Sequence, residues 1–332
     1  MIFQPAIIAL LLASALGVAM LAAAAPFALQ VTRRWDIHSG SELQLALERR
    51  TYLFSTLVTF VLALQLVALL LFVFNADRMA VMFVGAMCAV GALNANAWGF
   101  PALIAQMAMF FLAAMWLAIN HVDTRGRDYP LVKIKYGLLI GLLPALATVL
   151  ALQWLYFSNL RADVITSCCG SLFSGEAKGL SGDLSALPPK PALIGFYAAL
   201  GAAIAAAGHT AWHRTAGYVA ATASAVAFVA AVAGILSFLS LYLYEHPHHH
   251  CPFCILKPEY DWQGYWLYVP LFAATAAGLG VGAIQPFRKV ASLAAIIPAV
   301  TARLAGVAAG GFLLFAAAAS VMIFRSNLVL LE

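Results

Sequence analysis

The sequence predicts an all-α fold: a polytopic integral membrane bundle of about eight transmembrane helices, with a re-entrant or broken helix near residues 80–100. Of the 332 residues, 64% are hydrophobic and only 9% are charged. Apolar runs of about 20 residues recur along the chain, and that length spans a hydrocarbon core of about 30 Å. Because lipid offers the backbone no hydrogen-bond partners, such runs must be helices. We expect residues 1–332 to form a single membrane domain.

Polar loops separate the predicted spans. No Lys or Arg precedes the first apolar run, so we expect a retained helix and not a cleaved signal peptide, which needs a basic n-region. Residues 41–48 are expected to form a short interfacial helix before the second span, and the apolar residues 290–302 to lengthen or break the last one. The predicted spans cover residues 5–31, 51–75, 101–120, 137–159, 192–208, 217–244, 264–284 and 304–324.

Residues 80–100 do not read as an ordinary span. Asn94 and Asn96, followed by Gly99 and Pro101, fit poorly on a helix that faces lipid. Such a stretch is tolerated at membrane depth where it is buried in protein. The pattern therefore predicts a re-entrant or broken helix packed among its neighbours.

The net charge of +5 indicates topology, not nucleic-acid binding. Cytoplasmic loops of membrane proteins carry an excess of Lys and Arg. The loops expected in the cytoplasm are 32–50, 121–136, 209–216 and 285–303, which together hold 12 of the 18 Lys and Arg residues. The N terminus and the two loops 161–191 and 245–262 then lie on the outer face of what we expect to be a bacterial inner membrane.

The loop 245–262 concentrates reactive side chains between two apolar runs. It contains Cys251-Pro-Phe-Cys254, directly after three histidines. Two cysteines at this spacing can close a disulfide, and the first can be a stabilised thiolate. The four residues resemble the Cys-Pro-aromatic-Cys active site of glutaredoxins, but no βαβ pattern surrounds them, so the resemblance does not extend to the fold. A structural disulfide in a polar loop is the alternative.

The loop 161–191 carries a second pair, Cys168-Cys169. Adjacent cysteines close only a strained ring, and strained disulfides are easily reduced. The alternatives are a soft-metal site, pairing with distant thiols, or two buried apolar side chains.

Two outer-face pairs suggest our leading hypothesis, a membrane thiol–disulfide oxidoreductase or electron relay. Cys251 would attack, Cys254 would resolve, and Cys168 with Cys169 would form the second pair. The logic is similar to that of membrane oxidoreductases that use two exoplasmic pairs and a quinone. This chain is far longer than those four-helix proteins, so the likeness covers mechanism alone. It implies a soluble thioredoxin-like partner, and a quinone head group has candidate contacts in an aromatic belt formed by Trp262, Tyr265, Trp266 and Tyr268.

The competing hypothesis is soft-metal binding or transport, with a copper-like ion and a metal chaperone as partner. Six of the nine methionines fall within residues 79–115, although Met is also a good packing residue. Thiolates and thioethers select Cu(I), and imidazole suits copper and zinc. The candidate ligands are Met87, Cys88, His246, His248, His249, His250, Cys251 and Cys254.

Two further possibilities remain open at this point. His209 and His213 are four residues apart on one helix face, where they can hold a metal or haem or sit at the membrane interface. The whole chain can also be a non-catalytic membrane subunit of a larger redox complex.

Overall fold

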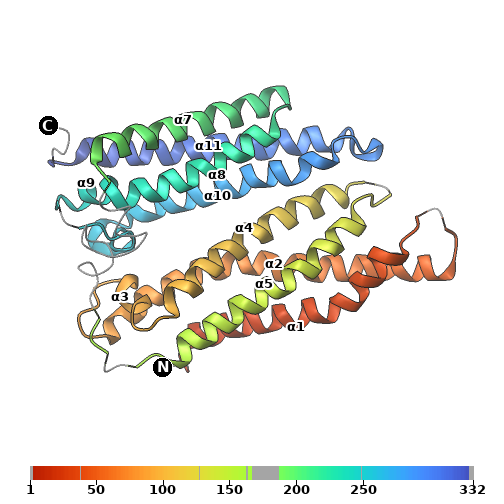
Figure 1. Ribbon diagram of the computed structural model, residues 1–332, viewed down its shortest axis with the longest axis horizontal. Coiled ribbons are helices and arrows are strands. Elements are labelled where there is room, and N and C mark those ends of the chain that lie inside the picture. The colour runs from red at the N-terminus through yellow and green to blue at the C-terminus, as the bar shows by residue number, and fades with distance from the viewer. Residues whose placement is uncertain are drawn as a thin grey trace. The chain divides into compact units, whose positions relative to one another are not determined.

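The computed structural model describes residues 3–37, 39–126, 128–161, 164–166, 187–247 and 249–328. These residues form helices and no β-strand, as the composition predicts (Figure 1). Eight of the helices are long and apolar enough to cross a membrane. They are Pro5–Arg34, Glu42–Met82, Gly99–Asp123, Val132–Ser158, Pro189–His213, Gly217–Tyr244, Gln263–Phe287 and Ile296–Arg325. The predicted membrane bundle is therefore confirmed, while the side on which each loop lies stays a prediction.

Several helix boundaries differ from the predicted ones, and the two largest differences lie at residues 41–48 and 290–302. The expected interfacial helix at 41–48 is the first two turns of one 38-residue helix, α2 (Glu42–Met79), because no Gly or Pro interrupts that run. The apolar stretch 290–302 is divided: a 3₁₀ turn at Ala291–Leu293 precedes α11 (Ile296–Arg325), so the last helix is longer than expected.

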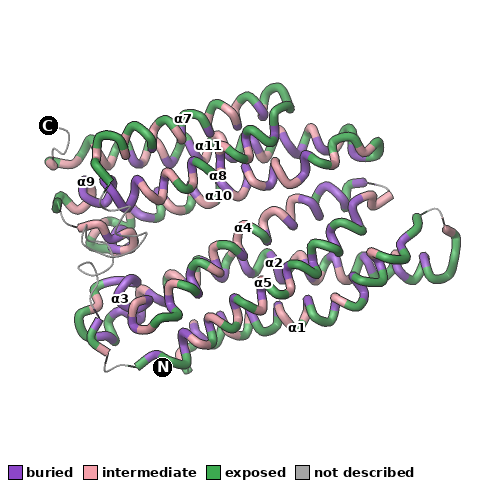
Figure 2. Tube along the Cα trace, in the orientation of Figure 1, coloured by how far each residue is buried: buried purple, intermediate pink, exposed green. Residues whose placement is uncertain are grey.

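The chain divides into two compact units. The first comprises Met1–Asn75, Asn96–Arg161 and Ala283–Pro298, and the second comprises Ala76–Ala95, Ala162–Gly282 and Ala299–Glu332. Along each long helix, buried positions alternate with exposed ones at helical spacing (Figure 2). This is the pattern of helices that turn one face to their neighbours and another to lipid.

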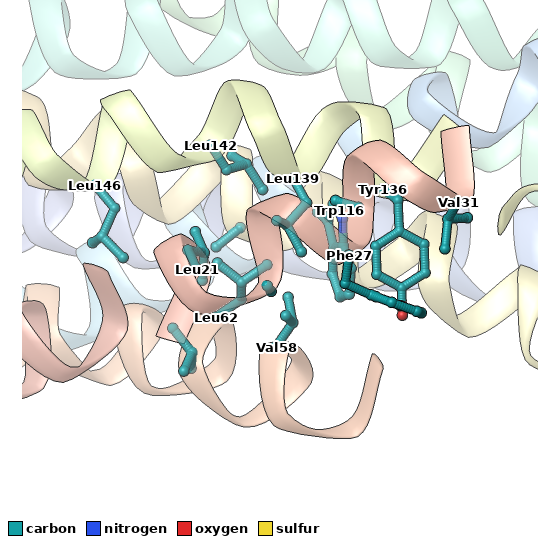
Figure 3. Close-up of a cluster of buried hydrophobic side chains, with 14 of the residues drawn as sticks. Leu21, Phe27, Val31, Val58, Leu62, Trp116, Tyr136, Leu139, Leu142 and Leu146 are labelled. Carbon is teal, nitrogen blue, oxygen red and sulfur yellow. The ribbon is translucent and has the colours of Figure 1, made fainter. Parts of the chain in front are cut away.

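The first unit is built from α1 (Pro5–Arg34), α2, α4 (Gly99–Asp123) and α5 (Val132–Ser158), with α5 packed against both α1 and α4. All four helices contribute to one apolar core (Figure 3). Phe27 meets Tyr136 edge to face, with ring centroids 5.4 Å apart. The fully buried Trp116 donates its indole N–H to the Lys135 carbonyl at 2.9 Å, so the core is tied to the α5 backbone.

A charged pair lies at one end of this core. Lys135 Nζ is 2.7 Å from Asp123 Oδ2, and the two side chains are 1% and 0% exposed. Lys135 also donates to Asn120 Oδ1 at 3.1 Å and to Ser55 Oγ at 3.3 Å, which accounts for its three ammonium protons. Asp123 Oδ1 accepts the Leu131 N–H at 2.8 Å. A buried charge needs partners of this kind.

A second polar layer crosses the same unit through four fully buried side chains, one from each helix. Ser14 donates to Gln153 Oε1 at 2.8 Å, and Gln153 Nε2 donates to Gln106 Oε1 at 2.9 Å. Gln106 Nε2 in turn donates to the Gln65 carbonyl at 3.2 Å. Side-chain hydrogen bonds of this kind join transmembrane helices across apolar surroundings.

The second unit contains α7 (Pro189–His213), α8 (Gly217–Gly234), α9 (Ser240–Tyr244), α10 (Gln263–Ile284) and most of α11. Its core gathers aromatic side chains, including Phe196, Phe238 and Phe315. Between α8 and α9 the span continues through a π-helical turn at Ile235–Leu239. Such turns alter the backbone hydrogen-bond pattern inside a helix and are frequent at functional sites.

The stretch 80–95 is a broken helix, as predicted. After α2 and a 3₁₀ turn at Ala80–Met82, the chain reaches α3 (Ala89–Leu93), whose five residues are all buried. Five residues extend only about 7.5 Å, so α3 crosses no bilayer. Asp77 Oδ1 accepts the Ala89 N–H at 3.2 Å, which satisfies a donor at the start of α3.

Candidate metal centre

Three cysteine side chains meet in the second unit. Cys88 immediately precedes α3, Cys251 lies in the loop after α9, and Cys254 begins a 3₁₀ turn at Cys254–Leu256. The sulfurs of Cys88 and Cys251 are 3.3 Å apart, and all three sulfurs lie within 4.8 Å of one another. Their residues are 0%, 0% and 5% exposed. The three cysteines are free thiols, and the Cys88–Cys251 separation is well beyond a covalent S–S bond of about 2.05 Å.

Two tyrosines hold the Cys251–Cys254 segment in place. Tyr244, the last residue of α9, donates its hydroxyl proton to the Cys251 carbonyl at 2.6 Å. Tyr268, on α10, donates to the Pro252 carbonyl, also at 2.6 Å. The loop backbone is therefore fixed from two helices, and the tyrosine protons are engaged by carbonyls and not by sulfur.

The 3₁₀ turn that carries Cys254 satisfies its own backbone. The Leu256 N–H donates to the Phe253 carbonyl at 3.0 Å, and the Lys257 N–H donates to the Cys254 carbonyl at 3.0 Å. Proline at position 252 has no N–H, so no donor is left to satisfy there. This short, self-bonded turn places two cysteine side chains three residues apart on the same side as Cys88.

The segment that carries Cys88 is fixed by a tight backbone approach. The Thr166 N–H donates to the Val84 carbonyl at 2.9 Å, in a short parallel bridge between Val84 and Ile165. Gly85 follows with φ +84°, where a side chain would collide with the Thr166 carbonyl. Glycine is thus required at this position, three residues before Cys88.

His250 is held by the π-helical turn. Its Nδ1 lies 2.7 Å from the Leu236 carbonyl oxygen. Since a carbonyl can only accept, Nδ1 carries the proton and Nε2 is the acceptor in the neutral ring. Imidazoles that bind metals are commonly oriented by such a bond to a carbonyl. His250 is half-buried beside Cys251, but its ring nitrogens are not in the group formed by the three sulfurs.

Charged side chains approach the same cluster. Asp77, on the last turn of α2, interacts electrostatically with Cys88 and with Lys257 and Glu259. The sequence pattern does not indicate a role for these three residues. Lys257 and Glu259 follow Cys254 by a few positions but belong to no motif, and Asp77 lies 174 positions before Cys251. Tyr244 was not singled out either, and Tyr268 was expected only as a member of the aromatic belt.

The spacing of the sulfurs suits one ion. With metal–sulfur bonds of about 2.3 Å, three thiolates around an ion lie about 3.8 Å apart in tetrahedral geometry and about 4.0 Å apart in a plane. The Cys88–Cys251 separation of 3.3 Å is somewhat shorter than those values, and no two of the three sulfurs are more than 4.8 Å apart. The donor set is all thiol, which is the chemistry that soft ions prefer.

The other sequence-predicted residues have varied positions. Cys168, Cys169 and His248 lie outside the described residues. Met87, adjacent to Cys88, is 70% exposed. His246 is exposed, and the half-buried His249 stacks on Tyr244 with ring centroids 4.0 Å apart. The structure thus places Cys88 beside Cys251 and Cys254. All three were among the candidate ligands of the metal hypothesis.

The aromatic and paired-histidine candidates lie at the surface. Trp262, Tyr265 and Trp266 are 47%, 40% and 71% exposed. His209 and His213 lie on the last turns of α7, so the loop expected at 209–216 begins after His213, and the ring centroids of the two histidines are 4.5 Å apart.

Comparisons with known protein families, with characterised proteins and with solved structures found no match for this chain.

Proposed function

We propose that the chain is an integral membrane protein that binds one soft metal ion through Cys88, Cys251 and Cys254. The observation that carries the proposal is the convergence of three buried sulfurs, from segments 163 residues apart, within 4.8 Å. Bringing three thiols together in an apolar interior has no obvious packing advantage over apolar side chains. A shared ion accounts for it.

Cu(I) is the ion that this donor set favours. Thiolates select Cu(I) over hard ions, whereas a structural Zn²⁺ site has four ligands in a tetrahedron. The group found among the described residues has three members, and Cu(I) is readily held by three thiolates in a plane. Each thiol loses its proton when it binds the ion.

Burial favours a metal site over a thiol–disulfide relay. Exchange with a soluble partner requires a thiolate that the partner can reach, and reactive cysteines are usually partly exposed. Cys251, the expected attacking residue, is 0% exposed.

The first experiment is metal binding by the detergent-purified full chain under reducing, anaerobic conditions. A competing Cu(I) chelator sets the free Cu(I) concentration, and Zn(II) is titrated in parallel. We expect about one Cu(I) per chain, and a loss of affinity of more than about 100-fold in each of C88S, C251S and C254S, because losing even an outer partner of a ligand costs about 10- to 100-fold.

M87L is the matched control, since it removes an exposed thioether next to Cys88 and leaves all three thiols. Its Cu(I) affinity should equal that of the wild type. Helical circular dichroism and size-exclusion profiles establish that the serine variants are folded. Folded serine variants that bind Cu(I) like the wild type would overturn the proposal.

A second candidate, the thiol–disulfide relay, is favoured by the 3.3 Å separation of the Cys88 and Cys251 sulfurs. Closing that bond releases two protons and transfers two electrons to an acceptor, which we assign to a quinone or to the disulfide of a soluble thioredoxin-like protein. Thiol counting on the metal-free chain distinguishes the two. The relay requires two thiols to disappear with a quinone and the C168S/C169S double variant to block turnover, whereas the metal site requires that variant to bind Cu(I) normally.

A further inference from the structure

A separate cavity of about 490 Å³ lies in the second unit, at the ends of three spans. Tyr242 and Glu245 line it from the end of the α8–α9 span, Trp266 from the start of α10, and Val321 and Arg325 from the last turns of α11. Ligand pockets usually measure about 300–1,000 Å³, so the cavity has room for a small head group. Tyr and Trp at the ends of spans mark the level where hydrocarbon meets head groups.

The charges in the cavity form a zwitterionic pattern. Arg325 is the last residue of α11, and Glu245 and Asp261 supply two carboxylates. Within the described part of the chain, the side chains of Arg325 and Asp261 form no ion pair and no hydrogen bond. A guanidinium and two carboxylates that face the same space suit a ligand with one anionic and one cationic group.

The Glu245 carboxylate is fixed in place by the chain beyond α11. Asn327 donates to Glu245 Oε1 from its backbone N–H and from its side chain, both at 2.9 Å. Ser326 Oγ donates to the Tyr242 carbonyl at 2.6 Å. These bonds set the Glu245 carboxylate against the end of α11, so the negative and positive groups of the cavity keep a defined separation.

The apolar part of the lining continues onto the lipid-facing surface. Ala318, Val321 and Met322 lie on α11 below Arg325, and Val321 is 55% exposed. Phe324 beside them is 92% exposed. A ligand whose polar head occupies the cavity can therefore pack a hydrocarbon chain along α11. A water-soluble zwitterion has no such chain and would leave this apolar surface uncovered.

We propose that this cavity binds the head group of a bilayer phospholipid that carries a primary ammonium, as phosphatidylethanolamine does. The phosphate lies on Arg325, which can bind it with two parallel hydrogen bonds. The ammonium donates to Glu245 and Asp261 and faces Trp266 as a cation–π partner. A choline head group has no N–H to donate, and an anionic glycerol head group has no cation for the two carboxylates.

The test uses the full chain, delipidated in detergent and re-equilibrated with equal amounts of ethanolamine, choline and glycerol phospholipids of identical chains. Native mass spectrometry counts the lipids retained. We expect the ethanolamine lipid to be retained about tenfold over the other two, since one or more charge-assisted hydrogen bonds distinguish them. Equal retention of all three overturns the proposal.

Two variants and a control assign the contacts. R325Q should lose retention of every phospholipid, and E245Q should lose the preference for ethanolamine over choline. R288Q, which removes an arginine of the first unit, should behave as the wild type. Wild-type retention in folded R325Q contradicts the proposal.

A measurement on the wild type needs no variant. Retention should fall stepwise along the series from the primary amine through N-methyl and N,N-dimethyl to choline, because each methyl group removes an N–H donor. Millimolar free phosphoethanolamine should not displace the lipid. Displacement by the soluble compound would show that the cavity recognises a water-soluble zwitterion and would overturn the assignment to lipid.

Discussion

The two units differ in the partners that surround their buried polar side chains. In the first unit, Lys135 and Asp123 are as inaccessible as the cysteines of the second, but each of their charges meets hydrogen-bond partners from the surrounding helices. In the second unit, three thiols converge on one another. A thiol is a weak donor and a weak acceptor, so the contacts between sulfurs contribute little by themselves. The first arrangement pairs its charges within the fold, and in our proposal the second provides the ligands of a metal ion.

The largest expected effect tests the structural half of this comparison. Lys135→Met leaves the Asp123 carboxylate buried beside an apolar side chain and should lower the free energy of unfolding by about 3–5 kcal/mol, the usual consequence of breaking a buried ion pair. Denaturant unfolding in detergent micelles measures the change, with helical circular dichroism as the signal.

Lys133→Met is the control, because Lys133 lies two residues away on α5 and is exposed. It should change stability by less than about 0.5 kcal/mol. The double variant Asp123→Asn, Lys135→Met should recover part of the loss, since it removes the unpaired charge. Equal stabilities for Lys135→Met and Lys133→Met would mean that the pair does not stabilise this unit.

The next effect concerns the support of the thiol site. Tyr268→Phe removes the hydroxyl that holds the Pro252 carbonyl and leaves that carbonyl without this donor. We expect a loss of Cu(I) affinity of about 10- to 100-fold, as for other outer partners of metal ligands. The Cu(I) dissociation constant, measured by competition with the chelator, tests this expectation.

Tyr265→Phe is the matched control, one turn away on α10 and 40% exposed. It should bind Cu(I) as the wild type does. If Tyr268→Phe also bound Cu(I) normally, the Cys251–Cys254 loop would hold its shape without this bond, and Tyr268 would have no part in supporting the site.

The third effect tests the π-helical turn. His250→Ala removes the donor that reaches the Leu236 carbonyl and should weaken Cu(I) binding by about three- to tenfold, the equivalent of one ordinary hydrogen bond. His246→Ala, in the same loop but exposed, should have no effect. A loss of more than about 100-fold in His250→Ala would instead identify His250 as a metal ligand.

The membrane class and the eight spans follow from local information. An apolar run of sufficient length must be a helix wherever it occurs, so hydropathy alone locates it. The broken stretch near Asn94 and Gly99 was predictable for the same reason. The proximity of Cys88 and Cys251 depends instead on contacts between segments 163 positions apart, and no local periodicity in the sequence indicates such contacts. Hydropathy likewise gives no sign that Tyr268 reaches the Pro252 carbonyl or that a π-helical turn reaches His250.

The partition into two units was also beyond the sequence. The expectation of a single membrane domain stays a prediction. The hydropathy of a span does not indicate which neighbouring spans it packs against, so the two compact units could not be located from the sequence. The predicted pair Cys168 and Cys169 lies outside the described residues, so the relay that depends on it stays a hypothesis.

The smallest expected effect tests the hydrogen-bonded layer of the first unit. Ser14→Ala removes one donor to Gln153 while leaving the Gln153–Gln106 bond in place. Hydrogen bonds between transmembrane helices average about 0.6 kcal/mol, so the variant should lose about that much stability. Ser158→Ala, at the exposed end of α5, is the control for detergent unfolding. A loss above about 2 kcal/mol in Ser14→Ala would mean that the four side chains act as one cooperative network, and the layer would then resemble the Lys135–Asp123 cluster in strength as well as in being fully buried.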